Sequence, residues 1–414
     1  MTDKAPVCRS GNRLWVLSEV FYPEETGTAY YITKIAEHLA ETRDVAVLCV
    51  QPSYSRAGDR APAREKHKGV EIYRCGAILP RRKTIAARLL KMTSITLSLA
   101  LNALFRVSRG DSILVVTNPP TLPVIAALIS LVLRVPYILV VHDVYPDIMA
   151  ACGLTTTRAL MYKLMQRVSR FVLRRASKIT TIGHDMLARL AEARGTGTSD
   201  GITVIPLWSD CGEVHPGRKE ENALLGQLGL SGKMVVLYAG NMGDPHGIDT
   251  LAAAARVLAE DEEVHFLFIG SGPKRRIIEE LVESGVGNVT ILAPRPRVEQ
   301  EDFLNACDVS ILSLVSGMLG LAVPSRTYNI MAAGKPVIAL VPQASETANV
   351  VREEGIGWVV EPGNPEQTVE AILAAKQNRQ LLREMGARAR VAAEVKYSPE
   401  IILRQFDTLL ADFR

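Results

Sequence analysis

Residues 324–336, PSRTYNIMAAGKP, contain residue types that could bind an anion at the start of a helix. Pro324 and Ser325 are typical of a first helical turn, and Gly334 is typical of the position just after a helix. Arg326 lies in that first turn, where its guanidinium, the backbone N–H groups and the helix dipole would all attract a phosphate. The segment therefore predicts a diphosphate site. The alternative is a surface arginine on a short packing helix.

Two glycine loops follow consecutive strand-like runs in the second half of the chain. Gly240 and Asn241 follow the first run, with His246 a few residues later, and Gly270 and Gly272 follow the second. Glycine lets the backbone approach a ligand closely, so the two loops together favour a nucleotide site. Neither loop has the G-x-G-x-x-G spacing, and no P-loop pattern occurs in the sequence.

Two segments of the first half could also contact a ligand. Thr26, Gly27 and Thr28 lie in a loop that opens a helix, and His142 with Asp143 ends a strand-like run. The first loop offers backbone N–H groups at a helix start, and the second could orient or polarise a substrate. Both features also have purely structural explanations. No D-x-D pair is present for a metal-bridged nucleotide, and no G-x-S-x-G pattern for a nucleophilic serine.

Strand-like and helix-like patterns alternate along the whole chain, which predicts parallel sheets covered on both faces. The alternation restarts near residue 230, so the fold class is α/β, with two doubly wound domains joined by the polar stretch 209–217. Ligands of such sheets bind at the carboxyl ends of the strands, so we expect the site in the cleft between the domains. Strands are expected at 14–18, 45–50, 70–74, 113–117, 137–142, 178–182, 202–205, 234–240, 264–270, 289–292, 309–312, 337–341 and 357–360, and helices include 30–39, 250–258, 274–283 and 366–375.

Length and composition are those of a folded protein with two domains. The chain has 414 residues, of which 48% are hydrophobic and 22% charged, and this composition excludes a largely disordered chain. Six cysteines occur without a C-x-x-C pair, which argues against a zinc site or a disulfide framework and favours reduced thiols in the cytosol. The first residues show no evident signal peptide.

The charge of the chain is distributed unevenly. Residues 1–210 contain 28 Lys and Arg against 17 Asp and Glu, whereas residues 211–414 contain 20 against 27. This asymmetry predicts that the first half meets an anionic partner, unless the two halves neutralise each other.

Two uncharged stretches of the first half could be related to a membrane. Residues 92–105 lie between Arg81, Arg82 and Lys83 on one side and Arg106 on the other, so they are interpreted either as an interfacial membrane helix or as a core helix. The uncharged stretch 112–133 contains three prolines and is expected to form a strand, a turn and a helix rather than a membrane span.

Together these segments resemble the family 4 glycosyltransferases of the GT-B type, over nearly the whole chain. The resemblance is carried by FYPEETG at 21–27, His142 with Asp143, VIPLWSD at 204–210, the two glycine loops, and MAAGKPV ending at Val337. It implies a Rossmann-like first domain at 1–208 that faces the acceptor and the membrane. A Rossmann-like nucleotide-sugar domain follows at 209–396, and a C-terminal helix in 397–414 packs back on the first domain.

The sequence departs from the family pattern at several positions. The family commonly has two glutamates separated by seven residues, and the matching positions here are Leu321 and Asn329. Asn329 can still bind a ribose hydroxyl, but Leu321 cannot act as a carboxylate. Asn241 and His246 replace the usual Arg and Lys, so Arg326 is expected to carry more of the diphosphate charge. Such changes resemble a subgroup that makes bacterial surface polysaccharide, including colanic-acid-type and N-acetylfucosamine transferases.

The resemblance implies a retaining glycosyltransferase that uses a UDP-sugar, with an N-acetylated amino sugar among the candidates. The acceptor would be a polyprenyl-diphosphate-linked polysaccharide precursor of the exopolysaccharide or O-antigen kind. The protein would work in the cytoplasm against the anionic inner face of the membrane, without a metal, other cofactor or nucleic acid. The alternatives are a nucleotide-sugar 2-epimerase and a non-catalytic partner subunit. The implied catalytic residues are His142 and Arg326, and the implied donor-binding residues are Thr26, Gly27, Thr28, Gly240, Asn241, His246, Gly270, Gly272, Arg295, Pro324, Ser325, Asn329 and Glu346.

Overall fold

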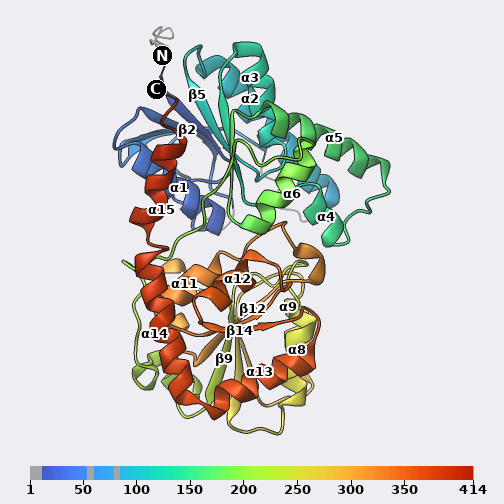
Figure 1. Ribbon diagram of the computed structural model, residues 1–414, viewed down its shortest axis with the longest axis vertical. Helices are drawn as coiled ribbons and strands as arrows, with labels where there is room; N and C mark the ends of the chain where they lie inside the picture. The colour runs from blue at the N-terminus through green and yellow to red at the C-terminus, as the bar shows by residue number, and fades with distance from the viewer. Residues whose placement is uncertain (1–11, 54–59, 79–83, 414) are drawn as a thin grey trace.

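The computed structural model describes residues 12–53, 60–78 and 84–413, and in it the chain forms two α/β domains (Figure 1). Each domain is built on one mainly parallel sheet, as the sequence predicts. The residues of the central strands are buried and mainly apolar, which is typical of a sheet covered on both faces. Arg81, Arg82 and Lys83 lie outside the described residues.

The sheet of the first domain has eight strands in the order β3-β4-β2-β1-β5-β6-β7-β8. The order reverses direction beside β1, whose two neighbours are β2 and β5, and such a switch point is where an open parallel sheet binds its ligand. The strands are β1 (Leu14–Leu17), β2 (Val45–Val50), β3 (Arg64–His67), β4 (Val70–Cys75), β5 (Ser112–Val116), β6 (Tyr137–Val141), β7 (Lys178–Thr181) and β8 (Ile202–Val204).

Strand β3 is the exception to the expectation of parallel strands throughout. It pairs antiparallel with β4 through a tight turn at Lys68 and Gly69, both of which have positive φ. Its four residues are all polar or charged and lie at the sheet edge. The sequence pattern missed this strand because no aliphatic residue marks it.

The helices of the first domain alternate with the strands and cover the sheet. They are α1 (Gly27–Leu39), α2 (Ile85–Arg106), α3 (Leu122–Leu133), α4 (Asp147–Ala151), α5 (Leu160–Arg175) and α6 (His184–Arg194). The stretch 112–133 forms β5, a turn and α3, so this prediction is confirmed. Among the described residues, none of the helices combines the length and the apolar character that a membrane crossing requires.

The core-helix interpretation of residues 92–105 holds for one of the two apolar faces of α2, and the interfacial-membrane interpretation stays a prediction. Ile95, Leu99 and Ala103 are spaced four residues apart and are buried against the core, so one face is that of a core helix. On the other face Leu97 is 58% exposed and Phe105 84% exposed.

The sheet of the second domain has six parallel strands in the order β11-β10-β9-β12-β13-β14, with a switch point between β9 and β12. The strands are β9 (Met234–Ala239), β10 (Val264–Ile269), β11 (Val289–Leu292), β12 (Val309–Ser313), β13 (Val337–Leu340) and β14 (Gly357–Val360). The helices are α7 (Ala223–Leu228), α8 (Ile248–Val257), α9 (Arg275–Glu283), α10 (Gln300–Asn305), α11 (Arg326–Ala332), α12 (Glu346–Glu353), α13 (Pro365–Gln377) and α14 (Arg379–Val395), and there are 3-10 turns η1 (Lys219–Glu221), η2 (Arg297–Glu299) and η3 (Ser316–Met318).

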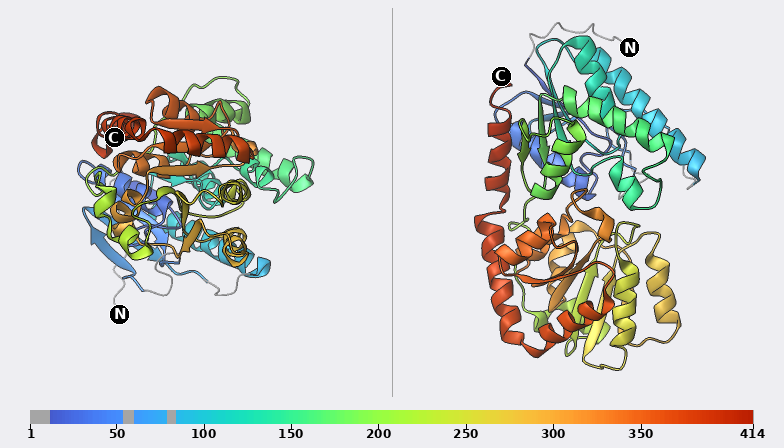
Figure 2. Two further views of the ribbon diagram at one scale, coloured as in Figure 1. Left: turned by 90° about the horizontal axis from the view of Figure 1, so that it is seen from below. Right: turned by 45° about the vertical axis from the view of Figure 1, so that its right-hand side comes forward.

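The chain ends in helix α15 (Pro399–Leu409), which returns to the first domain and packs on α1. Figure 2 shows α14 and α15, in red, running along both domains. The Nε2 atom of His38 lies 2.9 Å from the Oδ2 atom of Asp407. The Arg43 guanidinium donates to the carbonyl oxygens of Leu410 (2.8 Å) and Phe413 (2.6 Å). The Ser209 N–H also donates to the Tyr397 carbonyl at 2.7 Å, where the chain passes from α14 to α15 along one side of both domains (Figure 1).

Candidate active site

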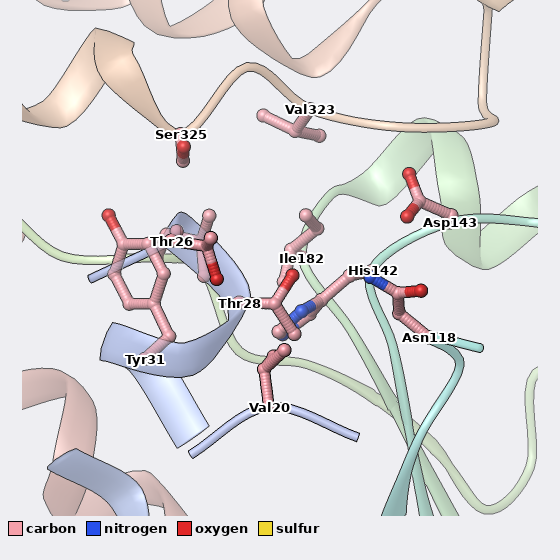
Figure 3. Close-up of a pocket in the computed structure, with 12 residues that line it drawn as sticks. Val20, Thr26, Thr28, Tyr31, Asn118, His142, Asp143, Ile182, Val323 and Ser325 are labelled. Carbon is pink, nitrogen blue, oxygen red and sulfur yellow. The ribbon is translucent and has the colours of Figure 1, made fainter. Parts of the chain in front are cut away.

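A cavity of about 280 Å³ lies where the two domains meet (Figure 3). The loops after five consecutive strands of the first sheet contribute to its lining, with Val20 after β1, Asn118 after β5, His142 after β6, Ile182 after β7 and Leu207 after β8. The carboxyl ends of parallel strands share one edge, so these residues meet although they are far apart in the sequence. The cavity is therefore at the position that the sheet topology predicts.

The start of α1 and one loop of the second domain complete the lining. Thr26, Gly27 and Thr28 line one side, and Ser325 with Val323 faces them from the second domain (Figure 3). Gly27 lies close to this loop, because a Cβ atom built on it would be 3.8 Å from the Ser325 hydroxyl oxygen. The two predicted loops, at 26–28 and at Ser325, thus lie on opposite walls of one cavity.

His142 and Asp143 are held in place through their backbone. The Thr117 hydroxyl oxygen accepts from the N–H groups of His142 (3.2 Å) and Asp143 (3.3 Å). Burial lowers the pKa of His142 to about 4, so the imidazole is neutral at pH 7, and its Nε2 makes no hydrogen bond with the described residues. Burial also raises the pKa of Asp143 to about 6. Both side chains therefore have unused hydrogen-bonding capacity facing the cavity.

The chain directly after β6, which carries these residues, continues into a contact with the second domain. Asp143 forms an isolated antiparallel bridge with Ala322, and the Val144 N–H donates to the Leu321 carbonyl at 2.9 Å. The Leu321 side chain itself is buried. Residue 321 thus contributes a backbone acceptor to the domain contact, which a leucine can do as well as a glutamate.

Arg326 reaches the first glycine loop of the second domain. Its guanidinium carbon lies 4.9 Å from the centre of the Tyr238 ring, and a Cβ atom on Gly240 would lie only 2.6 Å from that carbon. The Nη1 atom of Arg326 is buried and has no hydrogen-bond partner among the described residues. A partly buried arginine with an unused donor is suited to an anionic ligand. The helix that begins at Arg326, α11, has only seven residues, so any attraction of an anion here would depend on the Arg326 side chain rather than on a long helix dipole.

The two glycine loops pack against each other. The Gly240 N–H donates to the Ile269 carbonyl (2.8 Å) and the Met242 N–H to the Ser271 carbonyl (2.7 Å). A Cβ atom on Gly270 would lie 1.9 Å from the Gly240 oxygen, so no other residue fits there without moving the backbone. The glycines at these positions serve the close approach of the two loops as well as any approach of a ligand.

His246 lies in the same region but is not a cation. Burial and the nearby Arg326 lower the pKa of His246 to about 4, and its Nδ1 lies 2.9 Å from the Ser313 carbonyl oxygen. That oxygen is an acceptor, so Nδ1 carries the proton and Nε2 is an acceptor in the neutral ring. His246 therefore cannot replace the charge of a lysine beside a diphosphate.

Four other predicted donor-binding residues occupy different surroundings. Asn329 is buried with its Oδ1 atom unpaired among the described residues, so it keeps an acceptor for a ligand. The Pro324 carbonyl accepts from the Thr327 hydroxyl at 2.8 Å, and Arg295 forms an ion pair with Glu299 at 2.7 Å. Glu346 accepts from the N–H (2.8 Å) and Nδ1 (3.0 Å) of His184 at the start of α6, so its carboxylate already joins the two domains.

The predicted residues therefore fall into two neighbouring groups. Thr26, Gly27, Thr28, His142 and Ser325 line the cavity, whereas Gly240, Gly270, His246 and Arg326 gather around the glycine loops. The segment Pro324–Ser325–Arg326 connects the groups, because Ser325 faces the cavity and Arg326 faces Gly240. Asn118 also lines the cavity but was not predicted as a site residue. Its position two residues after β5, at the same edge of the sheet as His142 after β6, could have identified it.

Comparison with known proteins places the chain in a family. The family model "Glycosyl transferase 4-like domain" matches residues 26–208, and "Glycosyl transferases group 1" matches residues 233–378. The probable glycosyltransferase WbjE of Pseudomonas aeruginosa is 28% identical over 95% of this chain and 96% of its own length. The putative colanic acid biosynthesis glycosyl transferase WcaI of Escherichia coli is 25% identical over 93% of this chain and 96% of its own length.

Solved structures share the fold at lower identity. Sucrose-phosphate synthase of Thermosynechococcus elongatus has a TM-score of 0.73 at 18% identity, and the match covers 97% of this chain and 98% of the other. The Anabaena protein HepE, in complex with UDP and glucose, has a TM-score of 0.72 at 17% identity, with 97% and 99% covered. These neighbours confirm the two-domain GT-B fold.

The family matches cover most of both domains and agree with the motifs at 142–143, 240–243, 270–273 and 324–337. The resemblance inferred from the sequence is confirmed: the chain is a glycosyltransferase of group 1 with a family 4-like first domain and the GT-B fold.

Proposed function

We propose that this glycosyltransferase moves a sugar from a UDP-sugar to a lipid-linked polysaccharide precursor with retention of anomeric configuration. The observation that carries the proposal is the buried, unpaired Nη1 of Arg326 beside Gly240, one residue away from the cavity that Ser325 lines. A diphosphate at Arg326 would place the sugar of the donor in that cavity. HepE, a neighbour with the same fold, binds UDP and glucose, which supports the choice of donor.

On the diphosphate side, Arg326 would stabilise the negative charge that grows as the UDP leaves. Charge-assisted hydrogen bonds are the strong ones in proteins, and a donor already held in place loses little in reorganising. Asn241 is exposed at the same loop and would add a neutral hydrogen bond. We expect these groups to suffice without a metal ion.

On the sugar side, neutral His142 would hydrogen-bond the donor sugar rather than act as a free base. Its low pKa makes the imidazole a weak base at pH 7, although the unpaired Nε2 remains available to a hydroxyl. Asp143 is the only carboxylate among the described residues that line the cavity, and it would accept from a second hydroxyl.

The reaction we propose takes place on one face of the sugar. The bond from the anomeric carbon to the diphosphate oxygen breaks, and the acceptor hydroxyl attacks from the side on which UDP departs. The acceptor proton passes to a phosphate oxygen of the leaving group, so no separate protein base is needed. The products are UDP and a glycan that is one sugar longer and keeps the donor's anomeric configuration.

The acceptor we propose is a polyprenyl-diphosphate glycan, presented at the inner face of the cell membrane. The name of the relative WcaI refers to colanic acid biosynthesis, which supports a surface polysaccharide as the product. A donor with an N-acetylated amino sugar belongs in the first set of substrates to be tried.

The test is a screen of nucleotide sugars with a polyprenyl-diphosphate-sugar acceptor, in which UDP release and the product mass are measured. The proposal expects UDP release that depends on the acceptor, and a product heavier by one sugar residue. Interconversion of UDP-sugars in the absence of acceptor would instead indicate an epimerase. No turnover by the chain alone, with turnover after addition of a second protein, would indicate a partner subunit.

A further inference from the structure

We infer that the outer faces of α2, α3 and α5 form one surface that docks on an anionic lipid bilayer. We call it the three-helix face, and it is defined by exposed apolar side chains and the basic residues around them. Its apolar members on the helices are Leu89, Leu90, Leu97, Leu101, Leu104, Phe105, Leu128, Leu131, Val132, Leu160, Met161, Leu164 and Phe171, and Leu154 lies in the loop before α5.

On each of the three helices the exposed apolar residues follow a helical repeat. In α2, Leu90, Leu97, Leu101 and Leu104 are spaced by seven, four and three residues, and all are at least 43% exposed. Such spacing forms a continuous stripe along one side of a helix. The stripe is opposite the face that Ile95 packs into the core.

The stripes on α3 and α5 have the same character. Leu128, Leu131 and Val132 form a stripe on α3, and Leu160 and Leu164 form one on α5, where Leu160 is 84% exposed. Helix α3 packs between α2 and α5. In the right-hand view of Figure 2 the three helices lie together on the outer side of the first domain.

The rest of the described surface is much less apolar. Of the 23 large hydrophobic residues that are exposed, 14 lie between residues 89 and 171, and those of the second domain are scattered over several elements. Soluble monomers rarely expose a large contiguous apolar patch, so a patch of this kind indicates a surface that contacts something else.

The charge around the patch is strongly positive. Residues 84–178 contain 12 Lys and Arg but only three acidic residues. Of these, Asp111 and Asp147 are buried and Asp143 faces the cavity. Glu19 and Asp412, from elsewhere in the chain, form ion pairs with only two of the basic residues, Lys91 and Lys178, among the described residues. On α5, Lys163, Arg167 and Arg170 follow one another at helical spacing beside the apolar stripe.

This combination favours an anionic bilayer over a second copy of the chain. Basic side chains around apolar stripes match anionic headgroups above acyl chains. In a two-fold dimer the same face of each copy would meet the other. The basic residues around the two faces would then lie close together at low dielectric and repel each other. Because no described helix can span a membrane, the contact would be interfacial.

The three-helix face also reaches the cavity. Lys91, in the first turns of α2, forms an ion pair with Glu19 at 3.1 Å, and Val20, the residue after Glu19, lines the cavity. A glycan on a lipid held at this face would thus have a short path to the donor sugar. Only this last step rests on the proposed function, since docking itself requires no donor and no reaction.

The experiment measures binding of the full chain to vesicles without nucleotide. Wild-type protein should sediment with vesicles that contain phosphatidylglycerol, bind pure phosphatidylcholine vesicles weakly, and be partly released by high salt, because charges are screened within about 8 Å at physiological ionic strength.

Two sets of variants locate the contact. The basic set is Arg158→Glu, Lys163→Glu and Arg167→Glu, and its control is Arg256→Glu, Arg379→Glu and Arg404→Glu, exposed residues elsewhere that change the net charge equally. The basic set should weaken vesicle affinity by about tenfold or more, since each such residue near a membrane strengthens binding several-fold. The apolar set is Leu97→Gln, Leu101→Gln and Leu160→Gln, with Val257→Gln, Val391→Gln and Val395→Gln as its control. Both controls should bind like the wild type.

The outcomes separate this inference from the proposed function. Loss of vesicle binding by both face sets, with UDP affinity unchanged, supports the three-helix face whether or not the chain transfers sugar. Wild-type protein that ignores anionic vesicles at low salt would overturn it. Equal loss in the control sets would do the same. If sedimentation without vesicles shows a dimer that only the face variants dissociate, and the wild type does not bind vesicles, the occupant is a second copy and the inference is wrong.

Discussion

The guanidinium of Arg326 lies directly against Gly240, so closely that a methyl group on residue 240 would lie 2.6 Å from its central carbon. The two residues come from different parts of the second domain, and the Tyr238 ring beneath the guanidinium helps to hold it there. The position of the proposed diphosphate ligand therefore depends on the absence of a side chain at residue 240.

Replacing that glycine should displace the arginine. Gly240→Ala would also strain the backbone, whose φ of +146° suits glycine. We expect UDP affinity to fall by about 1–2 kcal/mol, the scale of one lost charge-assisted contact, when it is measured by calorimetry. Gly232→Ala is the control, because a Cβ atom there meets nothing within 4 Å. Equal UDP affinity in both variants would mean that Arg326 does not need this position.

Glu346 should matter for the domain contact more than for the donor. Glu346→Ala removes the acceptor for two donors of His184, and losing a buried, charged acceptor costs about 1–3 kcal/mol of unfolding free energy. We expect lower thermal stability with UDP affinity within about twofold of wild type. A large loss of UDP affinity in a variant of normal stability would instead restore Glu346 as a donor-binding residue.

The buried carboxylate of Asp143 should make stability depend on pH. Its pKa is about 6 in the folded chain and 3.8 as the ordinary value, so between these values the folded state binds more protons and the unfolding free energy falls as pH rises. Well above pH 6 the buried Asp143 carboxylate is ionised and lowers the unfolding free energy by its full amount. Asp143→Asn should then be more stable than wild type by about 2–3 kcal/mol. Near pH 4 the two proteins should unfold alike.

The same variant tests the role of Asp143 in the reaction. If Asp143 accepts from a sugar hydroxyl, Asp143→Asn should weaken UDP-sugar binding by about tenfold and leave UDP binding unchanged. A complete loss of transfer with normal UDP-sugar affinity would point to a carboxylate nucleophile, and would contradict the one-step reaction proposed above.

Transfer should not require a divalent metal. Activity is expected to survive excess EDTA, because Arg326 and nearby hydrogen-bond donors would stabilise the leaving diphosphate. Loss of activity in EDTA, restored by magnesium or manganese, would show that these groups are insufficient.

Much of the fold was predictable because buried parallel strands leave a clear pattern. Runs such as those of β2, β6 and β13 are continuous and almost entirely apolar, and glycines and helical patterns separate them. Strand β3 was missed because an exposed edge strand needs no aliphatic residues. The three-helix face was predicted only in α2, since the stripes on α3 and α5 become visible only once the opposite faces are known to be buried.

The site was predicted in its positions more than in its contacts. Ligands of parallel sheets bind at the carboxyl ends of the strands, and this rule predicted a site between the domains. His142 and the loop at 26–28 do line the cavity there. What the sequence could not show is how donors and acceptors are shared across the domains. Glu346 has the right chemistry for a ligand, yet its Oε2 atom accepts from His184 of the other domain. His246 could have been a cation, yet burial keeps it neutral.

The most direct test of the account is calorimetric titration of UDP into the wild-type chain and into Arg326→Ala. We predict measurable binding by the wild type and a loss of about 1.5–3 kcal/mol in the variant, the scale of a charged hydrogen bond. Arg256→Ala, a change at an exposed arginine far from the cleft, should bind UDP like the wild type. Unchanged UDP affinity in a folded Arg326→Ala protein would contradict the proposed diphosphate site, and with it the assignment of the cavity to the donor sugar.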